Sequence, residues 1–285
     1  MKAELILREN FLQFPEGPRL DERGNLYFGD ALERGFYRYS EKLGVEEIDS
    51  SATGIGGIVL HKDGGVIYSG RQGMMHFNPI SGEINRVNAL VDSMPLTNVN
   101  DIEADRDGNL YGGTLDFAAF DQGIPPQPGF LFRLSKGGQL SKLREVSLPN
   151  GLAFSPANNT FYFSESGEGV FRYDLDESGT VTSRILIAEI DDSDGIALDI
   201  EGNLWVARYL NDHVLCFNTN GKMAAKVLTP FKNVASLTFG GPDMRDLFIT
   251  GGVLMEMGQG GVAKIRVDIP GLKSHKTNVD ILKPV

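Results

Sequence analysis

A hairpin pattern that recurs six times along the 285-residue chain constrains the fold more than any other feature. Each copy has an alternating apolar and polar segment, a tight turn rich in Gly, Asp or Asn, and a second alternating segment, as in "NDIEADRDGNLYGGT". The copies begin at Glu16, Gly56, Asn100, Asn150, Asp194 and Ser236, so consecutive starts are 40, 44, 50, 44 and 42 residues apart. Third and fourth alternating segments follow most copies, which gives each repeat about four short strands.

Four strands in every 40–45 residues are typical of a β-propeller blade. Six copies fill the chain, so we predict an all-β fold in which residues 1–285 form a single domain, a six-bladed β-propeller. The regular period argues against the rival architecture, a long pair of β-sandwiches. We also expect "AELILREN" near the N-terminus to pair with "GGVAKIRVDI" in the last repeat, which would close the ring and leave no open sheet edge.

The composition excludes several classes of function. Lys and Arg total 27 against 38 Asp and Glu, a net charge of −11, and phosphate binding needs clustered cations, so we expect no nucleic-acid partner. The single cysteine, Cys216, excludes an internal disulfide and a Cys-based metal site, and we place it with Trp205 in the core. No apolar run has transmembrane length and the N-terminus does not read as a signal peptide, so we expect a cytoplasmic protein with no membrane partner.

The first residue of each hairpin has a constant position relative to its turn. Glu16, Asn100 and Asp194 each lie eight residues before a turn glycine, and Asn150 lies eight residues before Asn158. The first strand of a propeller blade lines the central channel, so residues in the same phase converge at one mouth of that channel. We therefore expect these four oxygen-bearing side chains to form a ring.

Two carboxylates and two amide oxygens are hard ligands, the kind that calcium and magnesium prefer. We expect one divalent cation in the central channel, bound by Glu16, Asn100, Asn150 and Asp194, with calcium favoured and magnesium, manganese or zinc as alternatives. Zinc suits the ring least because the ring contains no His or Cys. The opposing interpretation is that these Asn and Asp side chains only cap turns at the starts of strands.

The hairpins also carry a family resemblance. The stretches "EGPRLDERGNLYFGD", "NDIEADRDGNLYGGT", "PNGLAFSPANNTFYFSES", "DGIALDIEGNLWVA" and "SLTFGGPDMRDLFIT" resemble, in order, those of the gluconolactonase, regucalcin (senescence marker protein) and luciferin-regenerating enzyme family. The resemblance covers nearly the whole chain and implies a six-bladed propeller with a divalent metal in its channel. The family's metal residues match Glu16, Asn150 and Asp194, and Asn100 matches a position that contacts metal or substrate in different members.

This resemblance implies a metal-dependent lactonase, a carboxylic ester hydrolase whose substrate is a small cyclic ester. Such a metal would polarise the ester carbonyl as a Lewis acid. In such enzymes the residue that matches Asp194 is the candidate general base, and we expect Glu16 chiefly to hold the metal. The alternatives are a phosphotriester or phosphofluoridate hydrolase at the same metal, as in the similar diisopropyl-fluorophosphatase, and a non-catalytic calcium-binding propeller. We expect a monomer or a small homo-oligomer.

The chain departs from the family pattern where substrate would bind. Regucalcin-like members carry an arginine, used on sugar acids, at the position of Asn98, so the sequence argues against an aldonolactone. Many members also read "PDG" where this chain reads "DSDG", which suggests a looser turn beside Asp194. We expect Asn98 and Asn100 to contact the substrate.

The longest irregular segment, "LDFAAFDQGIPPQPG" (115–129), follows the Asn100 hairpin directly and should lie over the channel mouth. Phe117 and Phe120 would then form a partly apolar lid against the substrate. The alternative is a packed connection between strands. Of the four histidines, His76 is the one that we include among the substrate-contacting residues.

Overall fold

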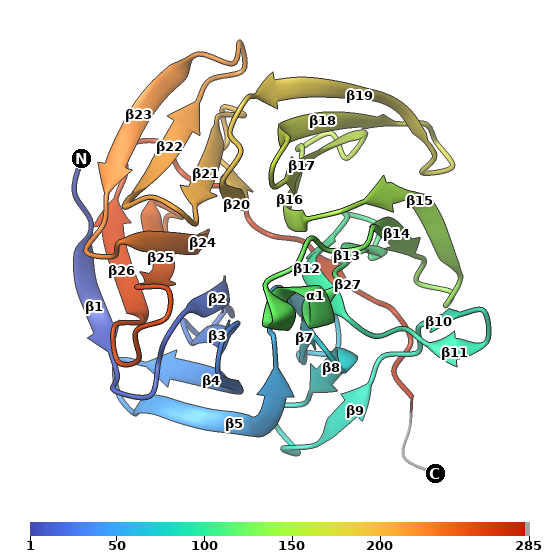
Figure 1. The fold of residues 1–285 in the computed structure, drawn as a ribbon, viewed down its shortest axis with the longest axis horizontal. Coiled ribbons are helices and arrows are strands. Elements are labelled where there is room, and N and C mark those ends of the chain that lie inside the picture. Colours follow the sequence, from blue (N-terminus) through green and yellow to red (C-terminus); the bar gives the residue numbers. More distant parts are fainter. Residues whose placement is uncertain (283–285) are drawn as a thin grey trace.

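The computed structural model describes residues 1–282, and these form six large, mainly antiparallel sheets around a common centre (Figure 1). The first strand of each sheet contacts the first strands of both neighbouring sheets, so six strands surround the channel. The predicted six-bladed β-propeller is therefore confirmed.

Strands of the same rank have the same position in every blade. The innermost strands are β2 (Pro15–Leu20), β6 (Ile58–His61), β12 (Val99–Ala104), β16 (Pro149–Phe154), β20 (Ser193–Leu198) and β24 (Asn233–Gly240). The second strands are β3 (Leu26–Asp30), β7 (Val66–Gly70), β13 (Leu110–Thr114), β17 (Thr160–Glu165), β21 (Leu204–Arg208) and β25 (Asp246–Gly252).

The two outer ranks continue each sheet away from the channel. The third strands are β4 (Arg34–Ser40), β8 (Gly73–Phe77), β14 (Gly129–Leu134), β18 (Gly169–Leu175), β22 (His213–Phe217) and β26 (Gly261–Arg266). The outermost strands are β5 (Gly44–Thr53), β9 (Ile84–Arg86), β15 (Leu140–Val146), β19 (Val181–Ala188), β23 (Met223–Leu228) and β1 (Glu4–Arg8). Smaller elements are β10 (Leu90–Val91), β11 (Met94–Pro95), β27 (Lys276–Thr277) and α1 (Phe117–Gln122).

The N-terminal strand closes the ring, as predicted. Strand β1 pairs antiparallel with β26, with Leu5 opposite Ala263, and so becomes the outermost strand of the sixth blade. Figure 1 shows the two ends of the repeat array side by side at this blade. The closure covers the edge of β26, which would otherwise present unpaired backbone groups to other chains.

The hairpin turns explain the repeated Asp-x-x-Gly-Asn motif. Between β20 and β21, the carboxylate of Asp199 accepts hydrogen bonds from the backbone N–H and the side-chain amide of Asn203, each at 2.9 Å. It also accepts one from the indole Nε1 of Trp205, at 3.0 Å. The same Asp-to-Asn pair of hydrogen bonds recurs between Asp21 and Asn25 and between Asp105 and Asn109. A short polar motif therefore fixes where each of these innermost strands ends.

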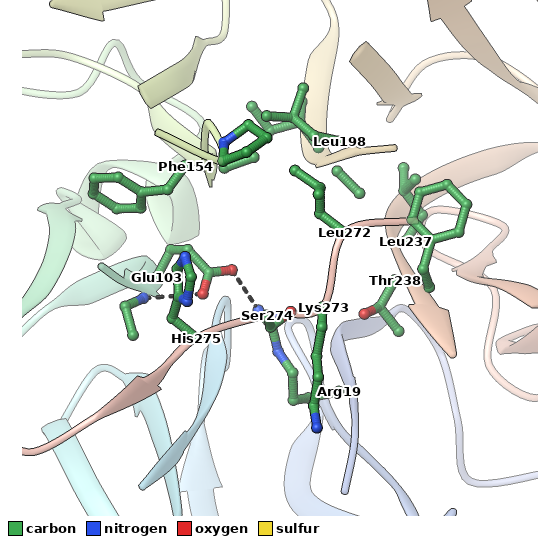
Figure 2. Close-up of a pocket in the computed structure, with 16 residues that line it drawn as sticks. Arg19, Glu103, Phe154, Leu198, Leu237, Thr238, Leu272, Lys273, Ser274 and His275 are labelled. Carbon is green, nitrogen blue, oxygen red and sulfur yellow. Dashed lines mark hydrogen bonds and ion pairs between the residues drawn. The ribbon is translucent and has the colours of Figure 1, made fainter. Parts of the chain in front are cut away.

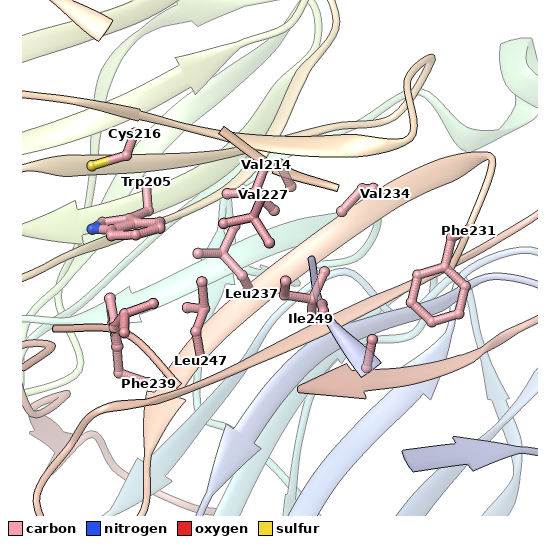
Figure 3. Close-up of a cluster of buried hydrophobic side chains, with 14 residues drawn as sticks. Trp205, Val214, Cys216, Val227, Phe231, Val234, Leu237, Phe239, Leu247 and Ile249 are labelled. Atoms are coloured by element: carbon pink, nitrogen blue, oxygen red, sulfur yellow. The ribbon is translucent and has the colours of Figure 1, made fainter. Parts of the chain in front are cut away.

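The hydrophobic core is divided into layers between neighbouring blades. Figure 3 shows one layer, in which Trp205 of the fifth blade packs edge-on against Phe239 of the sixth, with Cys216 and Leu247 in the same cluster. Trp205 and Cys216 are both buried, as predicted. Because each large apolar side chain removed from water contributes roughly 1.5–3 kcal/mol, packing between blades supplies much of the stability of the ring.

The C-terminal segment, residues 267–282, crosses one end of the channel, a feature that the repeat pattern did not predict (Figure 1). The Leu272 N–H donates to the Leu198 carbonyl of the fifth blade, and the Asn278 N–H donates to the Gly108 carbonyl of the third. Strand β27 lies parallel to β6 of the second blade. This segment, which we call the strap, therefore ties several blades together at the end of the channel opposite the predicted ring.

Helix α1 is the one helix within residues 1–282 and has six residues. The Asp116 carboxylate accepts a hydrogen bond from the Ala119 N–H at its start, and Gly123, with φ +62°, ends it. In the described part of the chain, no helix has the length and apolar character needed to cross a bilayer.

The turn motif generates a stability prediction. Asp199→Ala leaves several buried donors without an acceptor, so we expect the free energy of unfolding to fall by roughly 3 kcal/mol or more. Asp176→Ala is the matched control, because Asp176 accepts similar backbone hydrogen bonds in an exposed turn. Its cost should be about 1 kcal/mol or less. Urea unfolding of the two variants measures both values, and equal losses would show that burial of the turn carboxylate is unimportant.

Candidate functional site

The predicted ring residues lie where the innermost strands are interrupted by β-bulges. The pairing register with the second strand shifts between Glu16 and Arg19, Val99 and Ile102, Pro149 and Leu152, and Ser193 and Ile196. Asn100, Asn150 and Asp194 sit inside such a shift, and Glu16 sits at the start of one. A bulge re-aims a side chain out of the regular alternation of a strand. The four residues that lie eight positions before their turns are therefore also the residues at the β-bulges of these four blades.

The structure places the four residues on the innermost strands of four blades, where they form two pairs. The side-chain amide of Asn100 donates hydrogen bonds to Asn150 Oδ1 (2.6 Å) and to the Pro149 carbonyl (2.7 Å). Asn150 in turn donates through Nδ2 to Ser166 Oγ (2.7 Å). The carboxylates of Glu16 and Asp194 are buried, and they are close enough for their charges to repel each other. All four side chains therefore share one mouth of the channel.

The two remaining blades contribute small residues at this level. A Cβ at Gly56 would overlap the Oδ1 atom of Asn100, so glycine gives Asn100 its space. In the sixth blade the register shift lies between Val234 and Ser236, which places Ala235 in the bulge. Our alignment of Ser236 with the ring was therefore wrong by one residue, because a bulge adds a residue that alternation alone does not reveal.

The ring carboxylates lack the donors that other buried carboxylates of this protein have. Within residues 1–282, Asp194 accepts no hydrogen bond through its side chain, and Glu16 accepts one, from the Gly17 N–H at 2.8 Å. By contrast, buried Asp30 accepts from four backbone N–H groups, and buried Asp192 is paired with a guanidinium. A buried anion without donors needs a proton or a cation to compensate its lost hydration.

A third carboxylate, Asp101, belongs to the same site, and the sequence analysis missed it. Four blades carry a glycine directly after the ring residue, and these are Gly17, Gly57, Gly151 and Gly195. In the third blade that position is Asp101, which is buried. The sequence did contain a signal for this residue, because Asn100 is followed by an aspartate where four other blades have glycine. Burial raises the pKa of Asp101 to about 7, which the nearby Arg19 opposes and Glu103 reinforces.

The electrostatics of the ring favour a cation. Burial raises the pKa of Glu16 well above its usual value, and repulsion from Asp194 and then Asp101 adds to the effect. Burial likewise raises the pKa of Asp194, with repulsion from Asp101 and Asp192 added. A divalent cation among these oxygens would relieve both the desolvation and the repulsion. The donor set of carboxylate and amide oxygens fits calcium, magnesium or manganese.

The predicted substrate residues Asn98, Phe117 and Phe120 lie near the mouth in different environments. Asn98 is exposed, with φ +56°, and its carbonyl accepts from the Leu115 N–H. The Phe117 ring is buried under the guanidinium of Arg71, 4.8 Å away, and Phe120 is exposed. Figure 1 shows α1 close to the centre of the ring, in front of the second and third blades, so the segment has a short helix in place of the predicted irregular loop.

The structure does not bring His76 to the ring. His76 lies on β8, the third strand of its blade, whereas the ring residues lie on innermost strands. Its imidazole packs against that of His61, with ring centroids 5.2 Å apart, and its Nε2 atom is 3.2 Å from the carboxylate of Asp63. The sequence pattern around His76 could not predict where its side chain lies, because its partners His61 and Asp63 belong to a different hairpin turn.

The far end of the channel is closed by the strap. Figure 2 shows a pocket in which Leu272 and Ser274 of the strap face Arg19 and Glu103 of the innermost strands. Arg19 pairs with Glu103 at 2.8 Å and donates through Nε to the Ile58 carbonyl. Glu103 is three residues beyond Asn100, roughly 10 Å along an extended strand. The mouth on the α1 side is therefore the end of the channel that the strap does not cross.

Comparison with known proteins gives a consistent set of relatives. A family model described as "SMP-30/Gluconolactonase/LRE-like region" matches residues 14–252. The pentonolactonase XacC of Haloferax volcanii is 30% identical over 249 residues, which cover 82% of this chain and 80% of that protein. Regucalcin of Bos taurus is 27% identical over 285 residues, covering 93% and 94%.

Solved structures show the same fold. A luciferin-regenerating enzyme matches with a TM-score of 0.80 and 23% identity, covering 97% of this chain and 99% of that chain. Regucalcin from Agrobacterium tumefaciens, described as a calcium-binding protein, matches with a TM-score of 0.82 and 22% identity, covering 97% of each chain.

The carboxylates of the site generate a pH prediction. In metal-free protein, the free energy of unfolding should fall as pH rises from about 4 to about 7, because Asp101 keeps its proton in the folded state after losing it in the unfolded state. The loss is up to about 1.4 kcal/mol per pH unit for each such group, and it vanishes below the unfolded pKa, where both states are protonated.

Urea unfolding in chelator at several pH values within this range measures the slope. Asp101→Asn should reduce the slope by the share that Asp101 contributes, and the rest should come from Glu16 and Asp194, whose pKa values are also raised. Saturating calcium should reduce it further. An unchanged slope in Asp101→Asn would contradict the assignment of this titration to Asp101.

Proposed function

The chain belongs to the SMP-30/gluconolactonase/LRE-like family, and from this premise we propose that it is a lactonase whose single divalent cation is held by Glu16, Asn150 and Asp194. Relatives named as lactonases support the reaction class, among them the Haloferax volcanii pentonolactonase and a gluconolactonase from Xanthomonas campestris. The observation that carries the metal dependence is the pair of buried carboxylates, Glu16 and Asp194, that lack hydrogen-bond donors in the described residues.

When bound at this ring, the divalent cation supplies a Lewis acid for the carbonyl oxygen of a cyclic ester. Glu16 acts chiefly as a ligand, because its carboxylate is buried and oriented by the Gly17 N–H. Asn150 is held by its hydrogen bonds to Asn100 and Ser166, which keep its amide in one orientation. These contacts place the ligand atoms before substrate arrives, which limits reorganisation during the reaction.

Asp194 is the general base in this proposal. Its carboxylate has no competing donor within residues 1–282, so it is free to accept a proton from an attacking water. The water oxygen forms a bond to the carbonyl carbon, the ring C–O bond breaks, and the alkoxide leaving group takes up a proton. The product is a hydroxy acid whose carboxyl group is ionised at neutral pH, so each turnover releases one proton to the solvent.

Asn100 is placed to orient Asn150 and also to contact the substrate. Its amide nitrogen donates to Asn150 and to the Pro149 carbonyl, and its Oδ1 atom faces the space left by Gly56. We propose that Asn100 positions Asn150 and contacts the substrate. Asn98, exposed at the mouth, takes the place of the arginine that regucalcin-like members use on sugar acids, which favours lactones with no acid group at that end.

Proton release from a panel of sugar and aliphatic lactones tests the proposal directly. The protein is stripped with chelator, and calcium, magnesium, manganese or zinc is then restored. Turnover should vanish on stripping and return with one of these ions. Asp194→Asn should lower turnover by about 100- to 10,000-fold while the propeller still folds, because the base is lost.

Asp191→Asn is the matched control, since Asp191 is an exposed carboxylate in the same loop. Its activity should equal that of the unmodified protein. Full activity of Asp194→Asn would remove that residue from the mechanism. Absence of lactone turnover under every condition, with the cation still bound, would favour phosphoester chemistry or a binding protein.

A further inference from the structure

One hairpin turn departs from the motif that builds the others. Between β6 and β7 the sequence reads "HKDGG", so His61 stands where three other turns have Asp, and Gly65 stands where they have Asn. The turn keeps its shape, because the Gly64 N–H donates to the His61 carbonyl and the Gly65 N–H donates to Asp63 Oδ1 at 2.7 Å. The substitution therefore changes the chemistry of the turn without changing its backbone.

Two imidazoles and one carboxylate converge at this turn. His61 Nδ1 is 2.8 Å from Asp63 Oδ1, and His76 Nε2 is 3.2 Å from the same carboxylate. One ligand atom from each of the three residues lies within 4.8 Å of the others. Both histidines are buried, and Asp63 is about half exposed, so the cluster opens to solvent on one side.

Gly65 makes room for this arrangement. A Cβ at Gly65 would overlap His76 Nε2, so any other residue there would displace the imidazole from Asp63. The φ angle of Gly65 is not positive, so glycine is required here for space rather than for backbone conformation. In the corresponding turns an Asn side chain projects from this position toward its Asp partner.

The hydrogen bonding of His61 leaves its Nδ1 lone pair facing a carboxylate. Its Nε2 atom is 3.1 Å from the Val279 carbonyl, which can only accept, so Nε2 carries the proton. In the neutral ring Nδ1 is then an acceptor. It accepts from the Asp63 backbone N–H at 3.3 Å, and it lies 2.8 Å from a second acceptor, Asp63 Oδ1. Two acceptors at this distance need a cation between them, either a second proton on the ring or a metal ion.

The imidazole of His76 also points a ring nitrogen at the Asp63 carboxylate. Within residues 1–282 its Nδ1 atom has no hydrogen-bond partner, so its polar contact with the protein is through Nε2 alone, toward Asp63. From these contacts we propose that His61 Nδ1, His76 Nε2 and the Asp63 carboxylate form a binding site for a transition-metal ion of the zinc type at the base of the second blade.

The ligand types and spacing suit such an ion. Imidazole nitrogen and one carboxylate are ligands of zinc and cobalt, whereas calcium takes oxygen. Tetrahedral coordination at zinc places neighbouring ligand atoms roughly 3.3 Å apart. The two contacts to Asp63, at 2.8 and 3.2 Å, are close to this spacing, and the three ligand atoms lie within 4.8 Å of one another. Solvent on the open side of the cluster completes the coordination.

The contact with Val279 fits the same role. A histidine that binds a metal through one nitrogen usually donates its other ring N–H to a carbonyl or carboxylate, which fixes the tautomer. The Val279 carbonyl belongs to the strap, so a metal at this site would reinforce the attachment of the strap to the second blade. This site is separate from the channel ring, because His61 and Asp63 lie at the opposite end of the β6 strand from Gly56.

Cobalt binding to the full-length protein tests the proposal. The protein is stripped with chelator, supplied with saturating calcium to occupy oxygen ligands, and titrated with cobalt. We expect about one equivalent to bind with the strong visible absorption of a four- or five-coordinate site that has nitrogen ligands, and zinc should displace it. His76→Gln should weaken this binding by on the order of a hundredfold or more.

Asp63→Asn is the second variant, and it tests the site even if His76→Gln does not fold. Asp63 is half exposed, and asparagine can still accept from the Gly65 N–H, so the turn is kept. Zinc should raise the Tm of the unmodified protein by roughly 5 °C at a hundredfold excess over its dissociation constant, and it should not raise that of Asp63→Asn.

His213→Gln is the matched control. His213 is a buried histidine whose Nδ1 is 2.8 Å from the exposed Asp212, but only one imidazole is present there. This variant should bind cobalt as the unmodified protein does. Equal cobalt binding in the unmodified protein, Asp63→Asn and His76→Gln would overturn the proposal, and so would equal loss in His213→Gln.

Discussion

Six innermost strands can surround one narrow channel only if their backbones approach closely, and the rest of the structure depends on this approach. A Cβ at Gly17 would lie 2.7 Å from the Gly56 carbonyl, and one at Gly195 would overlap Ser236 Oγ. Glycines directly after the ring positions therefore let neighbouring blades meet. The bulges at the same level aim the preceding side chains along the channel. The same two features that close the ring of blades also build the site.

This close packing has an electrostatic consequence. Glu16, Asp101 and Asp194 are removed from water and placed near one another, with Arg19 as the nearby cation that lowers the pKa of Asp101. Uncompensated buried charges of one sign destabilise a fold, so the site needs protons or a metal ion. A divalent cation bound to hard oxygens would supply both compensation and a Lewis acid. Family membership and lactonase relatives agree with that use of the site.

The sequence was sufficient for the parts of the structure that repeat. The period of 40–50 residues predicted six blades, and the first-strand pattern predicted β1 beside β26. The phase of Glu16 and Asp194 predicted that both lie on innermost strands. It was insufficient where a position depends on contacts between repeats. Ser236 was misaligned because a bulge breaks alternation, and His76 was misplaced because its partners lie in another hairpin.

Asp101 and the strap were missed for related reasons. Asp101 replaces a glycine that other blades need for close approach, and only comparison of all six copies shows the exchange. The strap lies outside the repeats, and many of its contacts are backbone hydrogen bonds that no side-chain pattern records.

Anomalous diffraction from crystals of this protein grown with manganese in place of calcium tests the central claim most directly. The account predicts a strong peak in the channel, about 2.0–2.6 Å from oxygens of Glu16, Asn150 and Asp194. At a manganese concentration that saturates binding in solution, absence of a peak among these oxygens would contradict it. The same data would show whether Asn100 is a ligand or lies beyond bonding distance.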